Sequence, residues 1–328
     1  MRLTQNQLNK TLEQFDRIVK LYKDKYSGEP KRDWRTYEQR FALRMRQAAE
    51  EIEPVIEEAY SMISVSKRER GRPSKIPVVK KVLLLLIKEI FQLSNRRMAN
   101  MLGFFTFMTG IYISYKTVER AYSDELVRLT IHNMFTILAK RKGIEECDVS
   151  GDGTGYSLTV TRHYRNEREK ELKGRKADSK AFTYAFALMD LYTGMYIGYG
   201  TSLKSEKEAF REALGMANGT GIRIKSIRLD RLYSHQSITD EFDGGTRIYV
   251  IPKKNATIRG SPKWKRIIRN LLSDPFAFLK EYYRRNSSEN GFSVDKKLCG
   301  WKVWQRRIDR IGTALLCRGI WHNLMLIG

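Results

Sequence analysis

Apolar residues recur every three or four positions through the N-terminal part of the chain, which is the spacing of amphipathic helices. Over residues 1–65 this pattern runs among many charged residues, and a break at 27–30 (Ser-Gly-Glu-Pro) separates two helical pieces. Neither piece contains a group of residues that indicates chemistry. The pattern therefore predicts a helical arm over residues 1–65.

Shorter helices are expected in residues 66–142, after a basic linker that contains proline and glycine. The spacing predicts helices over Val78–Leu93, Asn95–Leu102, Tyr115–Leu126 and 128–142. Ser94 and Ser114 precede the second and third of these helices, where their hydroxyls can act as N-caps. A short helix, a turn and a second helix are typical of a helix-turn-helix, although the long turn over 103–113 leaves a generic three-helix bundle as an alternative.

The pattern changes after residue 143, where apolar and polar residues alternate and turn residues separate short segments. This alternation predicts strands over 144–150, 224–229 and 247–251, with a hairpin over 182–200 whose turn lies at 192–194. Helical spacing returns over 205–217, 234–241, 281–297 and 308–327. Such an order of elements is the pattern of an α/β fold with an RNase H-like mixed sheet flanked by helices, which we expect over residues 143–328.

The charge of the chain changes this picture by indicating a partner. The formal net charge is +24, while a hydrophobic content of 41% is enough for a folded core. A basic surplus on a folded chain favours nucleic acid, because neutralised phosphates release counterions. A membrane surface is the competing polyanion, but the charge is spread over the whole length, and the longest apolar run, 76–93, contains four charged residues. We therefore expect DNA as partner and no membrane.

The three cysteines and four histidines have no spacing typical of a zinc site. Together with an N-terminus that lacks an apolar signal region, this favours a reduced, cytoplasmic and nucleoid-associated protein.

Two segments are candidate DNA contacts in the helical region 66–142. Lys116 and Arg120 lie on the second helix of the expected helix-turn-helix-like unit, where they could reach DNA. Arg72 lies in a sequence, Arg-Gly-Arg-Pro over 70–73, that resembles short arms bound in a narrow minor groove. An ordinary interdomain linker is the alternative for this segment.

Three acidic residues follow predicted strands in the C-terminal region. Asp152 comes just after the first strand, Asp230 ends the fourth, and Glu289 lies on the helix after the fifth. Side chains at the carboxyl ends of neighbouring strands converge, and three carboxylates there suit two Mg²⁺ ions. The two aspartates also have structural interpretations: Asp152, between glycines, could be a turn residue, and Asp230 could be a cap.

The helix around Glu289 carries further polar residues at helical spacing. At about 100° per residue, the positions of Tyr282, Arg285, Glu289 and Lys296 fall within about 60° of one another. On spacing alone this stripe could be a solvated helix face. Gly291 lies between Glu289 and Lys296 and could break the helix.

These residues together resemble the DDE transposases of prokaryotic insertion sequences. The spacing Tyr282-x2-Arg285-x3-Glu289-x6-Lys296 is similar to the Tyr-Arg-Glu-Lys signature of one large group of that family. Asp152-Gly-Thr resembles the Asp-x-Thr of its first strand. Residues 229–234 resemble its second-aspartate segment, with Leu232 where glycine is common. The resemblance covers about residues 144–328 and includes the helical N-terminal part only loosely.

The resemblance implies an RNase H-like catalytic domain over 143–328 that binds two Mg²⁺, or Mn²⁺, through Asp152, Asp230 and Glu289. Water would attack the DNA at the ends of the insertion sequence, and the freed 3′-hydroxyl would attack target DNA, without a covalent protein intermediate. The partners would be terminal inverted repeats and target DNA, bound by a homodimer. In that setting Arg285 and Lys296 would hold phosphates, and Tyr282 would stack on a base or bond a phosphate.

Two other functions fit the same sequence. One is a non-catalytic, decayed or domesticated DNA-binding protein in which the helical arm and the region 66–142 bind DNA. The other is an RNase H-like nuclease that shares the metal site and differs in its substrate.

Overall fold

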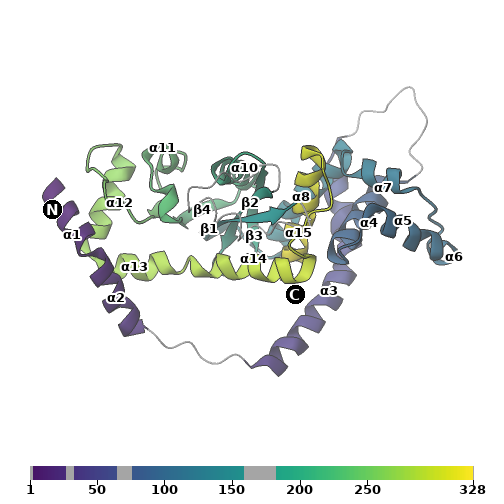
Figure 1. Ribbon diagram of the computed structural model, residues 1–328, viewed down its shortest axis with the longest axis horizontal. Coiled ribbons are helices and arrows are strands. Elements are labelled where there is room, and N and C mark those ends of the chain that lie inside the picture. Colours follow the sequence, from purple (N-terminus) through teal and green to yellow (C-terminus); the bar gives the residue numbers. More distant parts are fainter. Residues whose placement is uncertain (1–2, 27–32, 65–75, 159–181, 328) are drawn as a thin grey trace.

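A five-stranded mixed sheet lies at the centre of the molecule (Figure 1). The computed structural model describes residues 3–26, 33–64, 76–158 and 182–327. The strand order is β3-β2-β1-β4-β5. β2 pairs antiparallel with both β1 and β3, whereas β4 pairs parallel with both β1 and β5. The strands are β1 (Glu146–Ser157), β2 (Phe182–Asp190), β3 (Tyr196–Ser202), β4 (Arg223–Arg228) and β5 (Arg247–Tyr249). The predicted hairpin is therefore confirmed, as is the mixed α/β architecture.

Helices cover both faces of this sheet. Those before the sheet are α1 (Gln5–Glu13), α2 (Phe15–Tyr26), α3 (Trp34–Ser61), α4 (Val78–Ile90), α5 (Asn95–Phe104), α6 (Thr106–Thr109), α7 (Tyr115–Ala121) and α8 (Glu125–Arg141). Those after β3 are α10 (Glu206–Gly219), η2 (Arg231–Tyr233), α11 (Gln236–Thr239), α12 (Pro262–Ser273), α13 (Pro275–Tyr283), α14 (Asn286–Cys299) and α15 (Ile308–Leu324). In the described part of the chain, no helix is long and apolar enough to cross a membrane.

The alternation of strand residues divides their side chains between two hydrophobic cores. In β2, Ala185 and Ala187 belong to a core with α3, α4, α8, α14 and α15, whereas Phe186 and Leu188 belong to a core with α1, α10, α12 and α13. Successive side chains of a strand point to opposite faces, which explains this division. The first core includes residues from both sides of position 142, so the N-terminal helices and the sheet share one interior.

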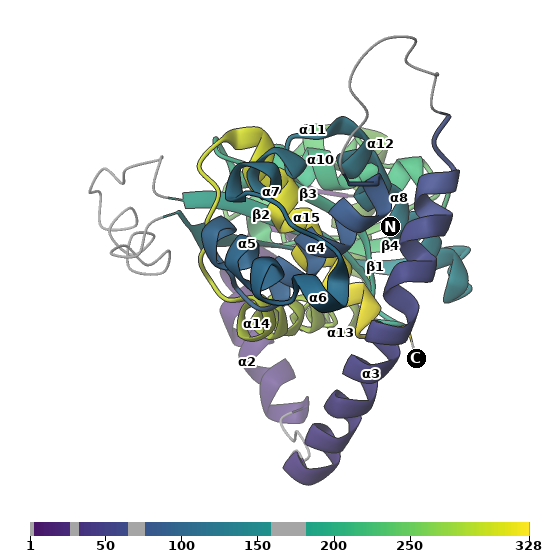
Figure 2. The ribbon, with the colours of Figure 1, turned by 90° about the vertical axis from the view of Figure 1, so that its right-hand side faces the viewer.

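The two ends of the N-terminal arm pack against different parts of the molecule (Figures 1 and 2). Leu8, Leu12 and Phe15 are buried in the core of α12 and α13, and the Tyr22 ring stacks on Tyr283 at 5.3 Å. α3 packs instead on α8 and α4.

The predicted caps are confirmed, and one predicted helix is divided. Ser94 Oγ accepts from the Arg97 amide at 3.2 Å and Ser114 Oγ from the Thr117 amide at 3.4 Å. The helix predicted over 115–126 ends at Ala121, and a new helix begins at Glu125 because Asp124 Oδ1 accepts from the Leu126 amide at 3.1 Å.

Two further expectations about local structure were wrong. The first strand does not end at residue 150: it continues to Ser157, because antiparallel pairing with β2 extends to Ser157↔Phe182. Asp152 is therefore inside the strand and is not a turn residue. The helix predicted over 281–297 is divided at residues 284–285 between α13 and α14. The Arg285 amide bonds to the Tyr282 carbonyl, three residues back, and the Arg285 carbonyl accepts from the Ser150 and Ser288 hydroxyls.

Candidate active site

The paired part of β1 and β4 ends shortly before Asp152 and Asp230. Ser150 on β1 pairs with Arg228 on β4, where that pairing ends. Asp152 lies two residues further along β1, so its side chain is on the same face as Ser150. Asp230 lies two residues beyond Arg228, just past the end of β4, where it caps η2.

The helices α13 and α14 run along this face of the sheet. On β4, the buried Arg228 forms an ion pair with Glu281 of α13, and its Nε donates to the Glu281 carbonyl at 3.2 Å. On β1, Ser150 Oγ lies 2.9 Å from Ser288 Oγ of α14. These contacts lie immediately before the two aspartates, so they hold the helices against the sheet beside Asp152 and Asp230.

Arg285 contacts the second aspartate directly. Its Nη2 lies 3.3 Å from Asp230 Oδ2, and its guanidinium lies over the Tyr282 ring at 5.4 Å. Asp230 Oδ1 also accepts from the Leu232 amide at 3.1 Å, so the capping role weighed from the sequence is present as well. The Asp230 side chain remains 45% exposed, which leaves room for a ligand.

Lys296 contacts the first strand on the other side of Asp152. Its Nζ donates to Thr154 Oγ1 at 2.7 Å and lies 5.1 Å from the centre of the Tyr156 ring. Arg285 and Lys296 are eleven residues apart, about three helical turns, so they belong to one stripe of the helix. Position 289 falls on this stripe between them. α14 is continuous through Gly291, so the glycine does not break the helix.

Tyr282 lies under this stripe, with only 4% of its surface exposed. Burial, as the largest cause, raises its pKa to about 12, so its phenol stays protonated at neutral pH. In this structure the ring supports Arg285, while its predicted contact with a base or a phosphate stays a prediction.

Two residues that the sequence did not single out as site residues lie beside the aspartates. Tyr233 Oη donates to Glu206 Oε1 at 2.9 Å, and the Glu206 side chain packs on Gly153, where an added Cβ would lie 2.4 Å from its carboxyl carbon. Burial raises the pKa of Tyr233 strongly, and the carboxylates of Glu206, Asp152 and Asp230 raise it further. Tyr233 therefore contacts Glu206 and lies within electrostatic range of both aspartates.

The donor set fits a hard divalent cation. Asp152 and Asp230 supply carboxylate oxygens, the ligands that Mg²⁺ prefers, and both are close enough to Tyr233 to raise its pKa. Within the described side chains, however, no group of three metal-ligating residues is present. The Glu289 backbone lies on α14, and its side chain is outside the described part of the chain.

Comparison with known proteins identifies the family. The chain is 43% identical over 305 residues, 93% of its length and 89% of the relative's, to a protein of Archaeoglobus fulgidus named "Probable transposase for insertion sequence element ISA1214". The chain belongs to the insertion-sequence transposases. No protein-family model and no solved structure matches it.

The predicted DNA contacts of this transposase lie apart from one another in the sequence. Lys116 and Arg120 are exposed on α7, and Arg72 lies outside the described residues. No comparison tests these three residues, and they stay predictions.

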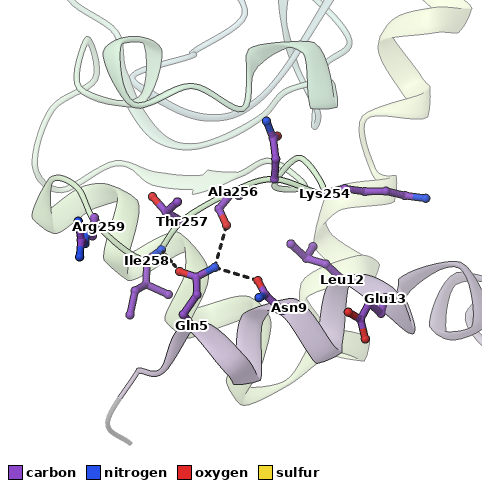
Figure 3. A pocket seen from close by; sticks show the side chains of 10 residues that line it. Gln5, Asn9, Leu12, Glu13, Lys254, Ala256, Thr257, Ile258 and Arg259 are labelled. Carbon is purple, nitrogen blue, oxygen red and sulfur yellow. Dashed lines mark hydrogen bonds between the residues drawn. The ribbon is translucent and has the colours of Figure 1, made fainter.

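A basic loop over 253–259 lies near the segment that follows Asp230. Gln236 Nε2 donates to the Arg259 carbonyl at 2.7 Å on one side. On the other side, Gln5 of α1 donates to the Ala256 carbonyl at 3.0 Å and accepts from the Ile258 amide at 2.9 Å (Figure 3). A pocket of about 950 Å³ lies between α1 and this loop. The exposed Lys254 and Arg259 make the loop a further candidate for phosphate contact in the transposase.

Proposed function

We propose that this transposase cleaves the ends of an insertion sequence and joins them to target DNA by phosphoryl transfer at Asp152, Asp230 and Glu289. The observation that supports this most is that both aspartates lie two residues beyond the last β1–β4 pair, beside the stripe of Arg285, 289 and Lys296. The order of strands and helices supports an RNase H-like domain, and the basic composition supports DNA as substrate.

The three acidic residues would hold two Mg²⁺ ions, with Mn²⁺ as a substitute. Bound metal ions would supply activation of the attacking oxygen and neutralisation of phosphate charge. The side chains of the chain itself would orient the substrate. Arg285, whose guanidinium contacts Asp230, would hold a phosphate by bidentate contact. Lys296 adds a point charge beside Thr154.

Strand cleavage and strand transfer then need no protein nucleophile. Water would attack at each end and the resulting 3′-hydroxyl would attack the target phosphate, so every covalent change takes place on DNA. We also propose that two copies of the chain hold two DNA ends.

A cleavage assay tests this function. The substrate is a duplex that carries the terminal inverted repeat flanking the gene, incubated with the full chain and Mg²⁺. Cleavage should be abolished in Asp152→Asn, Asp230→Asn and Glu289→Gln, since an amide cannot replace a carboxylate ligand. Asp243→Asn is the matched control, because Asp243 is exposed and outside the site. Cleavage by Asp230→Asn at the wild-type rate would refute the proposal.

The same assay separates the alternative functions. A non-catalytic DNA-binding protein would bind the repeat without cleaving it under any metal. An RNase H-like nuclease would cleave without preference for the repeat and would form no joined product.

A further inference from the structure

The helices α5 and α6 lie at the end of the molecule opposite α12 (Figure 1). Large apolar side chains are exposed on and beside these two helices. Phe104, Phe107, Met108 and Tyr112 are 74%, 81%, 71% and 81% exposed. Single exposed apolar residues are common, but four within nine positions form a patch that indicates a binding surface.

A groove of about 740 Å³ lies between α5 and the segment 112–115. Its lining combines aromatic rings, Phe104, Tyr112 and Tyr115, with the polar side chains of Arg96 and Asn100. Arg96 lies over the Tyr115 ring at 5.0 Å, which fixes its guanidinium at the edge of the groove.

A small core holds this groove in shape. Met98 and Leu102 of α5 and Val118 of α7 are buried with Leu84 of α4, and Ile111 and Ile113 pack against them. The exposed rings therefore are not needed to hold α5 and α7 together.

The charge around the groove selects the kind of partner. Between Ile90 and Val118 the sequence contains no aspartate or glutamate and three basic residues, Arg96, Arg97 and Lys116. All three are exposed. Aromatic faces beside arginine, in a segment without acidic residues, suit the bases and phosphates of unpaired nucleic acid, because bases stack on aromatic rings and phosphates pair with arginine.

We propose that this groove binds unpaired nucleotides of DNA, with bases stacked on Phe104 and Tyr112 and a phosphate held by Arg96. Asn100 can bond the edge of a base. The proposal rests on the proposed function for its DNA substrate, and it adds a site that is separate from the carboxylates. The single-stranded DNA would be that exposed when an end is opened or cleaved.

Binding of a labelled twelve-thymidine oligonucleotide to the full chain tests this proposal by fluorescence anisotropy. Tyr112→Ala and Phe104→Ala should each weaken binding about 5- to 100-fold, the range expected for loss of one stacked base. Tyr112→Phe keeps the ring and should bind as the wild type does. Tyr192→Ala is the matched control, because Tyr192 is 96% exposed at the β2–β3 turn.

The outcomes of this assay distinguish the proposed groove from the alternatives. Unchanged affinity in Tyr112→Ala and Phe104→Ala overturns the proposal. If these variants keep their affinity for the oligonucleotide but change from dimer to monomer in light scattering, the proposal is also overturned, because the patch is then an interface between two copies. If the wild type binds the oligonucleotide through Tyr112 but cleaves no DNA with any metal, the proposed function fails while the groove stands.

Discussion

Replacing Gly291 with alanine tests whether α14 must lie as close to the sheet as it does. An added Cβ at this position would stand 2.7 Å from Tyr196 Oη and 3.3 Å from His322 Cε1. The first distance is shorter than carbon and oxygen atoms tolerate. Tyr196 cannot move away easily, because its ring stacks on His322 at 3.8 Å and its hydroxyl donates to Asp295 at 2.8 Å.

The expected magnitude follows from two opposing effects. Alanine stabilises a helix by about 0.8–1 kcal/mol relative to glycine. Overpacking of a filled interior costs about 1–3 kcal/mol. Gly291→Ala should therefore lower the free energy of unfolding by up to about 2 kcal/mol. Because α14 carries Glu289 and Lys296, the same shift should slow DNA cleavage.

Gly215→Ala supplies the matched control. Gly215 lies on α10 with no atom near its missing Cβ, so the same substitution should stabilise the protein by about 1 kcal/mol. Urea denaturation of both variants measures the difference. If Gly291→Ala is as stable as Gly215→Ala and cleaves at the wild-type rate, α14 does not need this close approach.

Three further predictions concern groups around the site. The Asp295 carboxylate, 2.7 Å from His322 Nδ1, and the Gly194 carbonyl raise the pKa of His322 above 6.5 although burial opposes this. Its contribution to stability should be complete below pH 6.5 and lost as pH rises through the higher folded-state pKa. Urea midpoints should therefore fall as the pH rises above 6.5, and fall less in His322→Gln. Arg318→Met should lower the free energy of unfolding by about 3–5 kcal/mol, because it breaks a buried ion pair with Glu89. Arg211→Ala should lower it by less than about 1 kcal/mol, because the Arg211 side chain, which pairs with Glu241, is 60% exposed. Tyr233→Phe removes the hydroxyl that donates to Glu206, so it should lower the free energy of unfolding in urea by about 1–3 kcal/mol and slow DNA cleavage. Unchanged stability and an unchanged cleavage rate would exclude a positioning role for Tyr233.

The sequence predicted the elements that local patterns determine. The hairpin turn at 192–194 and the caps Ser94 and Ser114 follow from short-range residue chemistry, and the structure confirms them. The length of β1 could not be predicted in this way, because its glycines indicate a turn until β2 is known to pair with them.

Contacts between distant segments explain the remaining differences. The break between α13 and α14 depends on the Ser150 hydroxyl, which bonds the Arg285 carbonyl from another element. Glu206 was missed as a neighbour of the aspartates because it begins α10 with an ordinary first-turn glutamate. Its position beside Gly153 and Tyr233 appears only when the strands are assembled.

Binding of Mn²⁺ to the full chain, followed by electron paramagnetic resonance, tests the central claim most directly, because it does not depend on turnover. Asp152→Asn, Asp230→Asn and Glu289→Gln should each weaken Mn²⁺ binding by at least about tenfold, since each removes a charged oxygen ligand. Asp243→Asn should bind as the wild type does. Wild-type affinity for Mn²⁺ in all three site variants would contradict a metal site at these carboxylates.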